Sequence, residues 1–241
     1  MSLAPPTPPA TRWLAVRLPH LALDLYTRGT QERKTPVAVA ATVERRERII
    51  DCNPAAKERG VRPGLPVSAA RVILDSLVVA VRDPAAEQHA RERLAAWCYQ
   101  YSNQVCIPDG RDGLLLEAGG SRRLFGSPEE LAQRLQRELG QLGYHAEAGS
   151  APTPEAAWLA ADQHLHIGAR GHVRRQLGAL PLARLPLDDA CLRAMERMGF
   201  RQLRDLLRLP RKALTRRFGP ALPDYLDRML GICPDLRVFY Q

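Results

Sequence analysis

Hydrophobic positions along the chain form short runs, and these runs alternate with segments in which they recur every three or four residues. Runs rich in valine, isoleucine and leucine indicate buried strands, whereas the wider spacing indicates one face of a helix. We expect strands over 13–18, 36–41, 48–52, 77–81, 114–116 and 144–149. We expect two short helices between 53 and 74, and longer helices over 84–101, 128–142 and 153–163. Strands that alternate with helices predict an α+β or α/β sandwich.

The pattern changes after about residue 171, where short apolar helices follow one another without a strand signal. Proline and glycine separate these helices, so we expect a small helical domain in this part of the chain. Met198, Gly199 and Phe200 interrupt one helix and start the next, which predicts a helix-hairpin-helix unit. In such a unit the glycine turn and the following helix start expose backbone amides to a phosphate group.

Basic residues concentrate in the same helical segment. Between residues 192 and 217 there are nine bases and two acids, and this difference of +7 compares with a net charge of +9 for the whole chain. The leucines at 203, 206, 207 and 214 have the spacing of a core face, and bases recur on the other side. Such a surface binds the nucleic-acid backbone without reading bases; an ordinary solvated helix face is the alternative. The residues that we predict to contact DNA are Gly199, Arg201, Arg204, Arg208, Lys212, Arg216 and Arg217.

Composition narrows the class of protein. Only three of the 35 basic residues are lysines, and the planar fork of arginine suits phosphate, although a GC-rich genome also produces an arginine excess. The five cysteines are scattered without a CxxC pair, which argues against a zinc ribbon or a disulfide framework and favours a reducing cytoplasm. No apolar run is long enough to cross a bilayer, so we expect no membrane partner. Residues 1–11 predict a disordered proline-rich tail.

The segment from His164 to His166 is one candidate for a metal site. In a strand both imidazoles share a face, and Asp162 and His172 lie near them in the sequence. No third ligand has the spacing of a zinc site, so we do not assign a metal to this segment. Phosphate-loop, dinucleotide-binding and GxSxG motifs do not occur in the sequence, which disfavours the enzymes that depend on them.

A second candidate site surrounds the strand predicted over 114–116. Asp112 and Glu117 flank this strand, and a glycine turn with the basic segment SRRLFG follows it. Carboxylates on neighbouring strands can hold a pair of metal ions. This stretch is therefore either a metal-dependent active site or the remains of one.

The order of these segments resembles that of the Y-family (UmuC/DinB-like) translesion DNA polymerases. The run PVAVAATVERRERIIDCNPAAKERGVRPGLPVSAARVI resembles their fingers, and LLLEAGGSRRLFGSPEELAQRLQRELGQLGYHAEAGSAPTPEAAWLA resembles their palm. The resemblance implies an α+β fold: a palm with a ferredoxin-like sheet and helices, small fingers, and a helical helix-hairpin-helix thumb. It places the palm over 12–32 and 75–170, the fingers over 33–74, the thumb over 171–231 and a truncated linker over 232–241.

The same resemblance assigns the metal-binding positions of the family to residues of this chain. The first acid of the family falls on Arg17, and its Asp-Glu pair falls on Asp112 and Gly113. Polymerases of this family hold two magnesium ions between such acids, and a guanidinium at the first position repels a divalent cation. Because one of three expected carboxylates remains, we expect no bound cofactor and no catalytic residue.

Nucleotide-contacting positions of the family have also changed. The tyrosine and arginine of the fingers that hold the incoming triphosphate fall on Pro54 and Lys57, and the palm lysines fall on Pro154 and Trp158. Pro54 offers neither a hydroxyl nor an amide hydrogen, whereas Lys57 keeps the charge. We interpret five positions as a vestigial active site: Arg17, Pro54, Lys57, Asp112 and Gly113.

A relocated metal site is the alternative, in which the chain is a low-activity translesion polymerase that needs Mg²⁺. Asp24, Asp112 and Glu117 would build this site. Asp112 and Glu117 are an odd number of residues apart, so they point to opposite faces of a strand. We expect Glu117 to be a surface or turn acid and Asp24 to lie on a helix face.

Within the Y family the resemblance is to the catalytically inactive ImuB-type branch. It implies a non-catalytic, DNA-binding adaptor of SOS-induced translesion synthesis and mutagenesis, in the bacterial cytoplasm and at the nucleoid. The implied partners are primed or damaged duplex DNA, a RecA-like accessory protein of the ImuA type, an error-prone C-family polymerase and the sliding clamp. Family members carry clamp contacts beyond the thumb, and no QLxLF-type motif stands near residue 241 of this chain. A third hypothesis is a protein-interaction module that does not bind DNA.

Overall fold

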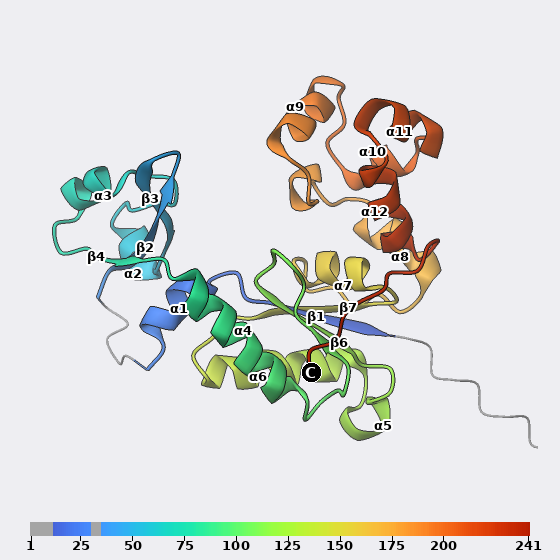
Figure 1. Cartoon of the computed structure of the whole chain (residues 1–241), viewed down its shortest axis with the longest axis horizontal. Coiled ribbons are helices and arrows are strands. Elements are labelled where there is room, and N and C mark those ends of the chain that lie inside the picture. The colour runs from blue at the N-terminus through green and yellow to red at the C-terminus, as the bar shows by residue number, and fades with distance from the viewer. Residues whose placement is uncertain (1–11, 30–34) are drawn as a thin grey trace, which may run out of the picture. The chain divides into compact units, whose positions relative to one another are not determined.

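The structure is a computed structural model that describes residues 12–29 and 35–241 (Figure 1). The proline-rich tail predicted over 1–11 lies outside the described residues. The chain divides into two compact units, which we describe one at a time. The first unit contains the residues up to Arg17 together with Ala95–Leu135 and Glu147–Gln241, and the second contains Leu18–Leu94 and Gln136–Ala146.

The first unit is built on a four-stranded antiparallel sheet in the order β5-β6-β1-β7. Its strands are β1 (Trp13–Arg17), β5 (Val105–Cys106), β6 (Gly113–Glu117) and β7 (Glu147–Ala151). β1 occupies the interior of the sheet because its first four residues are apolar and buried. The register places Arg17 opposite Gly113 on one side and opposite Glu147 on the other. These three residues therefore lie side by side at one end of the sheet.

Helix α7 (Pro154–Ala161) packs closely on β1 and β7 of this sheet (Figure 1). The close approach depends on small side chains, because α7 is rich in buried alanine and faces Gly149 of β7. A Cβ atom at Gly149 would lie 2.5 Å from the carbonyl carbon of Ala160 and 2.6 Å from the Cα of Ala161. This close packing fixes the position of α7 on the sheet, and with it the positions of the side chains of α7.

A series of helices of the first unit follows α7 in the sequence. They are α8 (Arg170–Leu177), the 3₁₀ turn η1 (Leu182–Arg184), α9 (Asp189–Arg197), α10 (Leu203–Leu207), α11 (Arg211–Phe218) and α12 (Ala221–Leu230). The four leucines predicted to face a core are buried, which confirms that interpretation. They belong to a hydrophobic cluster that also contains Trp13 of β1 and Leu115 of β6. The helical segment therefore shares its core with the four-stranded sheet.

Helices α4 (Pro84–Cys98) and α6 (Pro128–Gln141) each contribute residues to both units, and the short α5 (Arg122–Phe125) precedes α6. The start of α6 is a capping box in which Glu130 accepts from the amide of Ser127 at 2.6 Å and donates its own amide to the Ser127 hydroxyl oxygen at 3.2 Å. The sequence SPEE predicted this start, and the structure confirms it.

The second unit has a three-stranded sheet in the order β3-β2-β4. Its elements are α1 (Leu21–Thr27), β2 (Val37–Val43), β3 (Arg46–Cys52), α2 (Pro54–Glu58), α3 (Val67–Ile73) and β4 (Val78–Val81). β2 pairs antiparallel with β3 and parallel with β4. The hairpin between β2 and β3 turns at Glu44 and Arg45, whose φ angles of 50° and 63° suit a two-residue turn of this kind. A small apolar core lies between this sheet and helices α2 and α3.

Two elements differ from the prediction. β7 begins at Glu147 rather than at residue 144, because the amide of Tyr144 donates to the carbonyl of Leu139 at the end of α6. The next amide, of His145, donates to the carboxylate of Asp24 at 2.7 Å. β5 was not predicted, since a strand of two residues leaves no periodic signal. The α+β architecture itself agrees with the prediction.

We expect the substitution Gly149→Ala to lower the free energy of unfolding by about 1 to 3 kcal/mol, because the new methyl group overpacks the contact between β7 and α7. Gly140→Ala on α6 is the matched control. A Cβ atom there meets no atom within 4 Å, and alanine favours a helix by about 0.5 to 1 kcal/mol over glycine. Urea unfolding followed by circular dichroism measures both. Equal stability of the two variants would contradict the close packing.

Candidate functional site

Arg17 lies at the end of β1, where the resemblance to polymerases led us to expect a metal-binding acid. Its guanidinium forms an ion pair with Asp162 at the end of α7, and Nη1 lies 3.6 Å from the carboxylate of Glu147 on β7. The guanidinium also lies over the ring of Trp158, 5.7 Å from its centre. The side chain of Arg17 is 23% exposed and that of Asp162 is 5% exposed. A cation held between two carboxylates thus fills this end of the sheet.

Asp162 connects Arg17 with a residue of the helical segment. Its carboxylate also accepts from Arg184 of η1 at 2.9 Å and from the side chain of Gln163 at 3.0 Å. Burial alone would raise the pKa of Asp162, but the hydrogen bonds and charges of these donors hold it below its ordinary value. Asp162 is therefore an anion that is shared by two arginines.

Gly113 occupies the second of the predicted metal positions on β6. Its φ angle of 153° is one that side chains other than glycine rarely adopt. A Cβ atom there would lie 3.0 Å from the Cα of Arg17 and 3.0 Å from the ring of Trp158, and closer still to the carbonyl oxygen of Val16. A carboxylate at this position therefore requires a shift of the backbone.

The two positions predicted to replace the palm lysines lie on α7. Pro154 is buried in the first turn of this helix. Two guanidiniums lie near the ring of Trp158, that of Arg111 at 5.1 Å from its centre and that of Arg17 at 5.7 Å. Arg111 in turn donates to the buried Glu155 at 2.8 Å. An apolar ring and paired charges therefore occupy the positions to which the resemblance assigned lysines.

The carboxylates proposed for a relocated metal site have other neighbours. Asp112 is exposed and precedes β6, whereas Glu117 ends that strand. Glu117 accepts hydrogen bonds from the amides of Arg12 at 2.9 Å, Gly119 at 3.0 Å and Gly120 at 3.2 Å. Its role as a turn acid agrees with the prediction. Asp24 lies on α1 as predicted, but it is buried rather than solvent-facing.

The histidines of the segment 164–166 do not share a face of a strand, which was the arrangement considered for a metal site. His164 has a φ of 51° and is exposed at the turn after α7. The Nδ1 of His166 lies 3.0 Å from the hydroxyl of Ser150. Asp162 is engaged by arginines, as described above. Within residues 12–29 and 35–241 the structure contains no group of three or more histidine, cysteine or carboxylate side chains with the arrangement of a metal site.

Pro54 and Lys57 lie in the second unit, in the short helix α2. Asn53 caps this helix, since its side-chain oxygen accepts from the amide of Ala56 at 3.0 Å. The ammonium of Lys57 lies 3.9 Å from Asp51 of β3, and Nδ1 of His20 lies 2.6 Å from the same carboxylate. This hydrogen bond outweighs burial and raises the pKa of His20 above its ordinary value. Lys57 thus shares an anion with a histidine.

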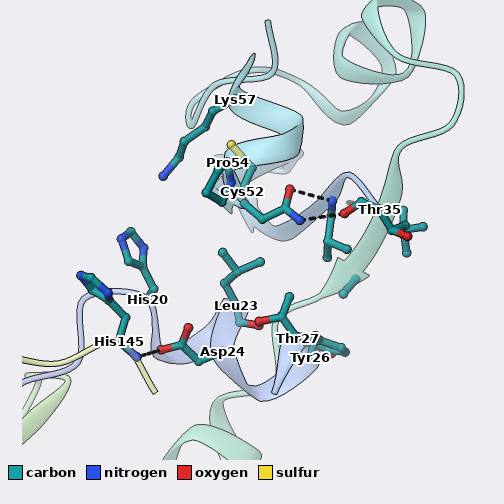
Figure 2. A pocket seen from close by; sticks show the side chains of 14 residues that line it. His20, Leu23, Asp24, Tyr26, Thr27, Thr35, Cys52, Pro54, Lys57 and His145 are labelled. Atoms are coloured by element: carbon teal, nitrogen blue, oxygen red, sulfur yellow. Dashed lines mark hydrogen bonds between the residues drawn. The ribbon is translucent and has the colours of Figure 1, made fainter. Parts of the chain in front are cut away.

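A pocket of about 680 Å³ adjoins Pro54 and Lys57 in the same unit (Figure 2). Figure 2 shows Lys57, His20 and His145 along one side of it, across from Thr35. Most of its lining is apolar and comes from α1, β2 and β4. Burial raises the pKa of Asp24, which lies beneath His145, from 3.8 to about 6. The sequence analysis missed this pocket, because His20, Asp51 and His145 are far apart in the chain and none belongs to a motif.

The basic residues predicted to contact DNA are exposed on α10, α11 and the turn before them. Arg204 and Arg208 are four residues apart, as are Lys212 and Arg216, so each pair shares a helix face. The ion pairs that the structure describes in this segment involve Arg184 and Arg211. None of the predicted contact residues takes part in one of these pairs.

One part of the predicted phosphate site is wrong. Gly199 forms the expected turn with a φ of 81°, but the amides that follow it are already engaged. Asp205 accepts from the amides of Arg201 and Gln202 at 3.0 Å each, in a capping box at the start of α10. The sequence placed Asp205 three residues after Gln202, a spacing that could have revealed this cap. Phosphate contacts in this region therefore depend on side chains.

The sequence of this chain matches a family model and known proteins. The sequence model described as impB/mucB/samB family matches residues 27–162. Protein ImuB of Caulobacter vibrioides is 36% identical over 182 residues, which cover 75% of this chain and 40% of that protein. DNA polymerase IV of Aeromonas hydrophila is 29% identical over 212 residues, which cover 83% of this chain and 60% of that protein. The chain thus spans about half the length of these relatives.

Solved structures of other proteins have a fold similar to that of this chain. An insertion ternary complex of Dbh DNA polymerase matches with a TM-score of 0.76 and 18% identity, covering 94% of this chain and 69% of that chain. DinB from Sulfolobus solfataricus matches with a TM-score of 0.72 at the same identity and coverage. Both share their fold with this chain, which confirms the predicted α+β, Y-family-like architecture. None of the helices in the described part of the chain has the length and apolar character needed to span a membrane.

We expect Arg17→Asp, which restores the acid of the resemblance, to destabilise the protein by about 3 kcal/mol or more, because it puts a third carboxylate beside Asp162 and Glu147. Arg184→Ala is the control. This substitution removes the more exposed partner of Asp162, and we expect it to lower the free energy of unfolding by about 1 kcal/mol or less. Thermal and urea unfolding compare the two. A stable Arg17→Asp protein would show that the cation is dispensable.

Proposed function

Because the chain belongs to the impB/mucB/samB family, we propose that it is a non-catalytic DNA-binding component of translesion synthesis. In this proposal the polymerase-like fold binds primed or damaged DNA and recruits partner proteins, while another polymerase forms the phosphodiester bonds. The observation that carries the proposal is the ion pair of Arg17 with Asp162 at the end of β1.

The chemistry of polymerases supports this assignment. Two-metal catalysis needs carboxylates that converge on both ions, and these ions neutralise the phosphates of primer and triphosphate. At the end of β1 the guanidinium of Arg17 is hydrogen-bonded to Asp162 and lies 3.6 Å from Glu147, so the two nearest carboxylates already face a cation. The position of Gly113 has no room for a further acid. The residues present do not fit a pair of magnesium ions.

A relocated metal site has little support. Asp112 and Glu117 are five residue steps apart along β6, a distance of roughly 16 Å in an extended strand. Ligands of one magnesium ion lie about 2 Å from it, so these two acids are too far apart to share an ion. The hydrogen bonds that Glu117 accepts from backbone amides also give this acid a structural role.

The thumb-like segment supplies the DNA contact in this proposal. Arg184 and Arg211 of this segment are paired with acids, but the bases predicted to contact DNA form none of the ion pairs that the structure describes, in contrast to Arg17 and Arg111. An arginine without a partner can exchange its counterion for a phosphate, which drives binding to the nucleic-acid backbone. The start of α9 does not help, because Asp188 and Asp189 make it acidic.

The partners in this proposal follow from the similarity to Protein ImuB. We assign to the chain a role in SOS-induced mutagenesis with a RecA-like accessory protein of the ImuA type and an error-prone C-family polymerase. A sliding-clamp contact belongs to the longer relatives in this view, and we do not place it in the residues described here.

We expect primer extension with this chain to show no incorporation with either Mg²⁺ or Mn²⁺, because the acids at the end of β1, Asp162 and Glu147, face the guanidinium of Arg17. Asp112→Ala should leave this result unchanged. An active Y-family polymerase run in parallel shows that the assay works. Template-directed incorporation that is lost in Asp112→Ala would establish the alternative of a low-activity polymerase with rewired ligands.

We expect joint replacement of Arg204, Arg208 and Lys212 by alanine to weaken binding of primed duplex DNA and to reduce the salt slope of log affinity by about 3, since each phosphate contact contributes about 0.9. The control replaces three exposed arginines outside the segment: Arg93, Arg123 and Arg137. Fluorescence anisotropy over a salt series measures both. Unchanged affinity of the thumb variant would favour a protein-interaction module without DNA binding.

A further inference from the structure

Strand β4 of the second unit has one edge that no strand of the described residues covers, because the sheet order ends at β4. The amides of Val78 and Arg82 donate toward β2, to the carbonyls of Pro36 at 3.0 Å and Ala40 at 2.8 Å. Alternation along a strand then directs the backbone groups of Val79 and Val81 to the other edge. The Val81 carbonyl accepts from the hydroxyl of Tyr26, which leaves most of that edge available.

This edge lacks most of the usual protections against pairing. Protein sheets keep edge strands short or blunt them with charged residues, proline or a bulge, and of these features β4 has only its length of four residues. β4 reads VVAV, its pairing with β2 is regular, and Val78 and Val81 are 50% and 68% exposed. An edge of this composition is a template for another extended chain.

The pocket of about 680 Å³ lies on one face of the same strand. Val78 and Ala80 line it from β4. Leu23 and Tyr26 line it from α1 (Figure 2). Its volume is in the range of pockets that hold a compact ligand or a few side chains. An extended chain added to β4 would direct every second side chain toward this pocket face, since the side-chain period of a strand is two.

The polar side of the pocket presents cations to the outside. The side chains of Lys57 and His20 are 40% and 33% exposed, whereas that of Asp51 between them is 13% exposed. Asp24, the acid among the lining residues, is buried. An incoming carboxylate therefore meets the two cations before it meets either acid.

We propose that β4 and this pocket bind an extended segment of a partner protein, with apolar side chains at alternate positions and an acidic side chain near Lys57. Main-chain hydrogen bonds to the edge supply affinity in such an arrangement, and the pocket supplies selectivity. The mostly apolar lining favours a polypeptide over a free nucleotide. This interaction uses residues other than those of the proposed DNA contact.

Selection of a phage-displayed library of random 12-residue peptides on the whole chain tests the proposal. We expect enriched peptides to alternate apolar residues and to carry an acid, and synthetic copies to bind at least about tenfold more weakly to Val79→Pro and Ala80→Trp. Proline at 79 removes an outward amide and is tolerated at an edge, whereas tryptophan at 80 fills the pocket. Lys57→Glu should weaken the binding of the acidic peptides in particular.

The control Val72→Ser, at an exposed position of α3, should bind the peptides as the parent chain does. Binding of primed duplex DNA by Val79→Pro and Ala80→Trp should equal that of the parent, which separates this proposal from the DNA-binding function. Three results would overturn it. They are the absence of an enriched peptide, peptides that bind both variants with the affinity of the parent chain, and a dimer of this chain that Val79→Pro dissociates. Displacement of the peptides by a deoxynucleoside triphosphate would also overturn it in favour of a nucleotide site.

Discussion

The ion pair of Arg17 with Asp162 is the interaction on which the first unit depends. Arg17 ends the strand in the interior of the sheet, Asp162 ends the helix that covers this sheet, and Arg184 connects the same carboxylate to the helical segment. A buried carboxylate without partners would be costly. The pKa of Asp162, held low by its donors, shows that the pairing more than compensates for burial. One anion thus joins strand, covering helix and helical segment.

The two groups of arginines in the first unit differ in what surrounds them. Arg17 and Arg111 lie over Trp158 and are paired with acids, so their charges are already compensated within the protein. The arginines of α10 and α11 project into solvent, and apart from Arg211 they have no acidic partner in the described residues. These two arginines of the palm-like sheet are therefore engaged with acids, and our proposal assigns the contact with a polyanion to the helical segment.

Much of the fold could be predicted from the sequence, because it depends on local signals. The capping box at Ser127 and the buried leucines of α10 and α11 follow from spacing alone. The site could be predicted only where a residue type decides the chemistry, as with a guanidinium in place of an acid at Arg17. The partners of Arg17, the engaged amides before α10 and the pocket beside β4 depend on tertiary contacts. His20, Asp51 and His145 lie in different elements, so no motif joins them.

The replacements at the end of β1 support one another, which makes them hard to reverse one at a time. An acid at position 17 meets the carboxylates of Asp162 and Glu147 before it meets a metal ion. An acid at position 113 collides with the backbone of β1 and with Trp158. A lysine at position 158 would place its ammonium between Arg17 and Arg111, where the ring now stacks. Each single reversion therefore loses stability before it gains any metal affinity. A binding function that does not use this end of the sheet places no opposing demand on these residues, and the satisfied network persists as structure.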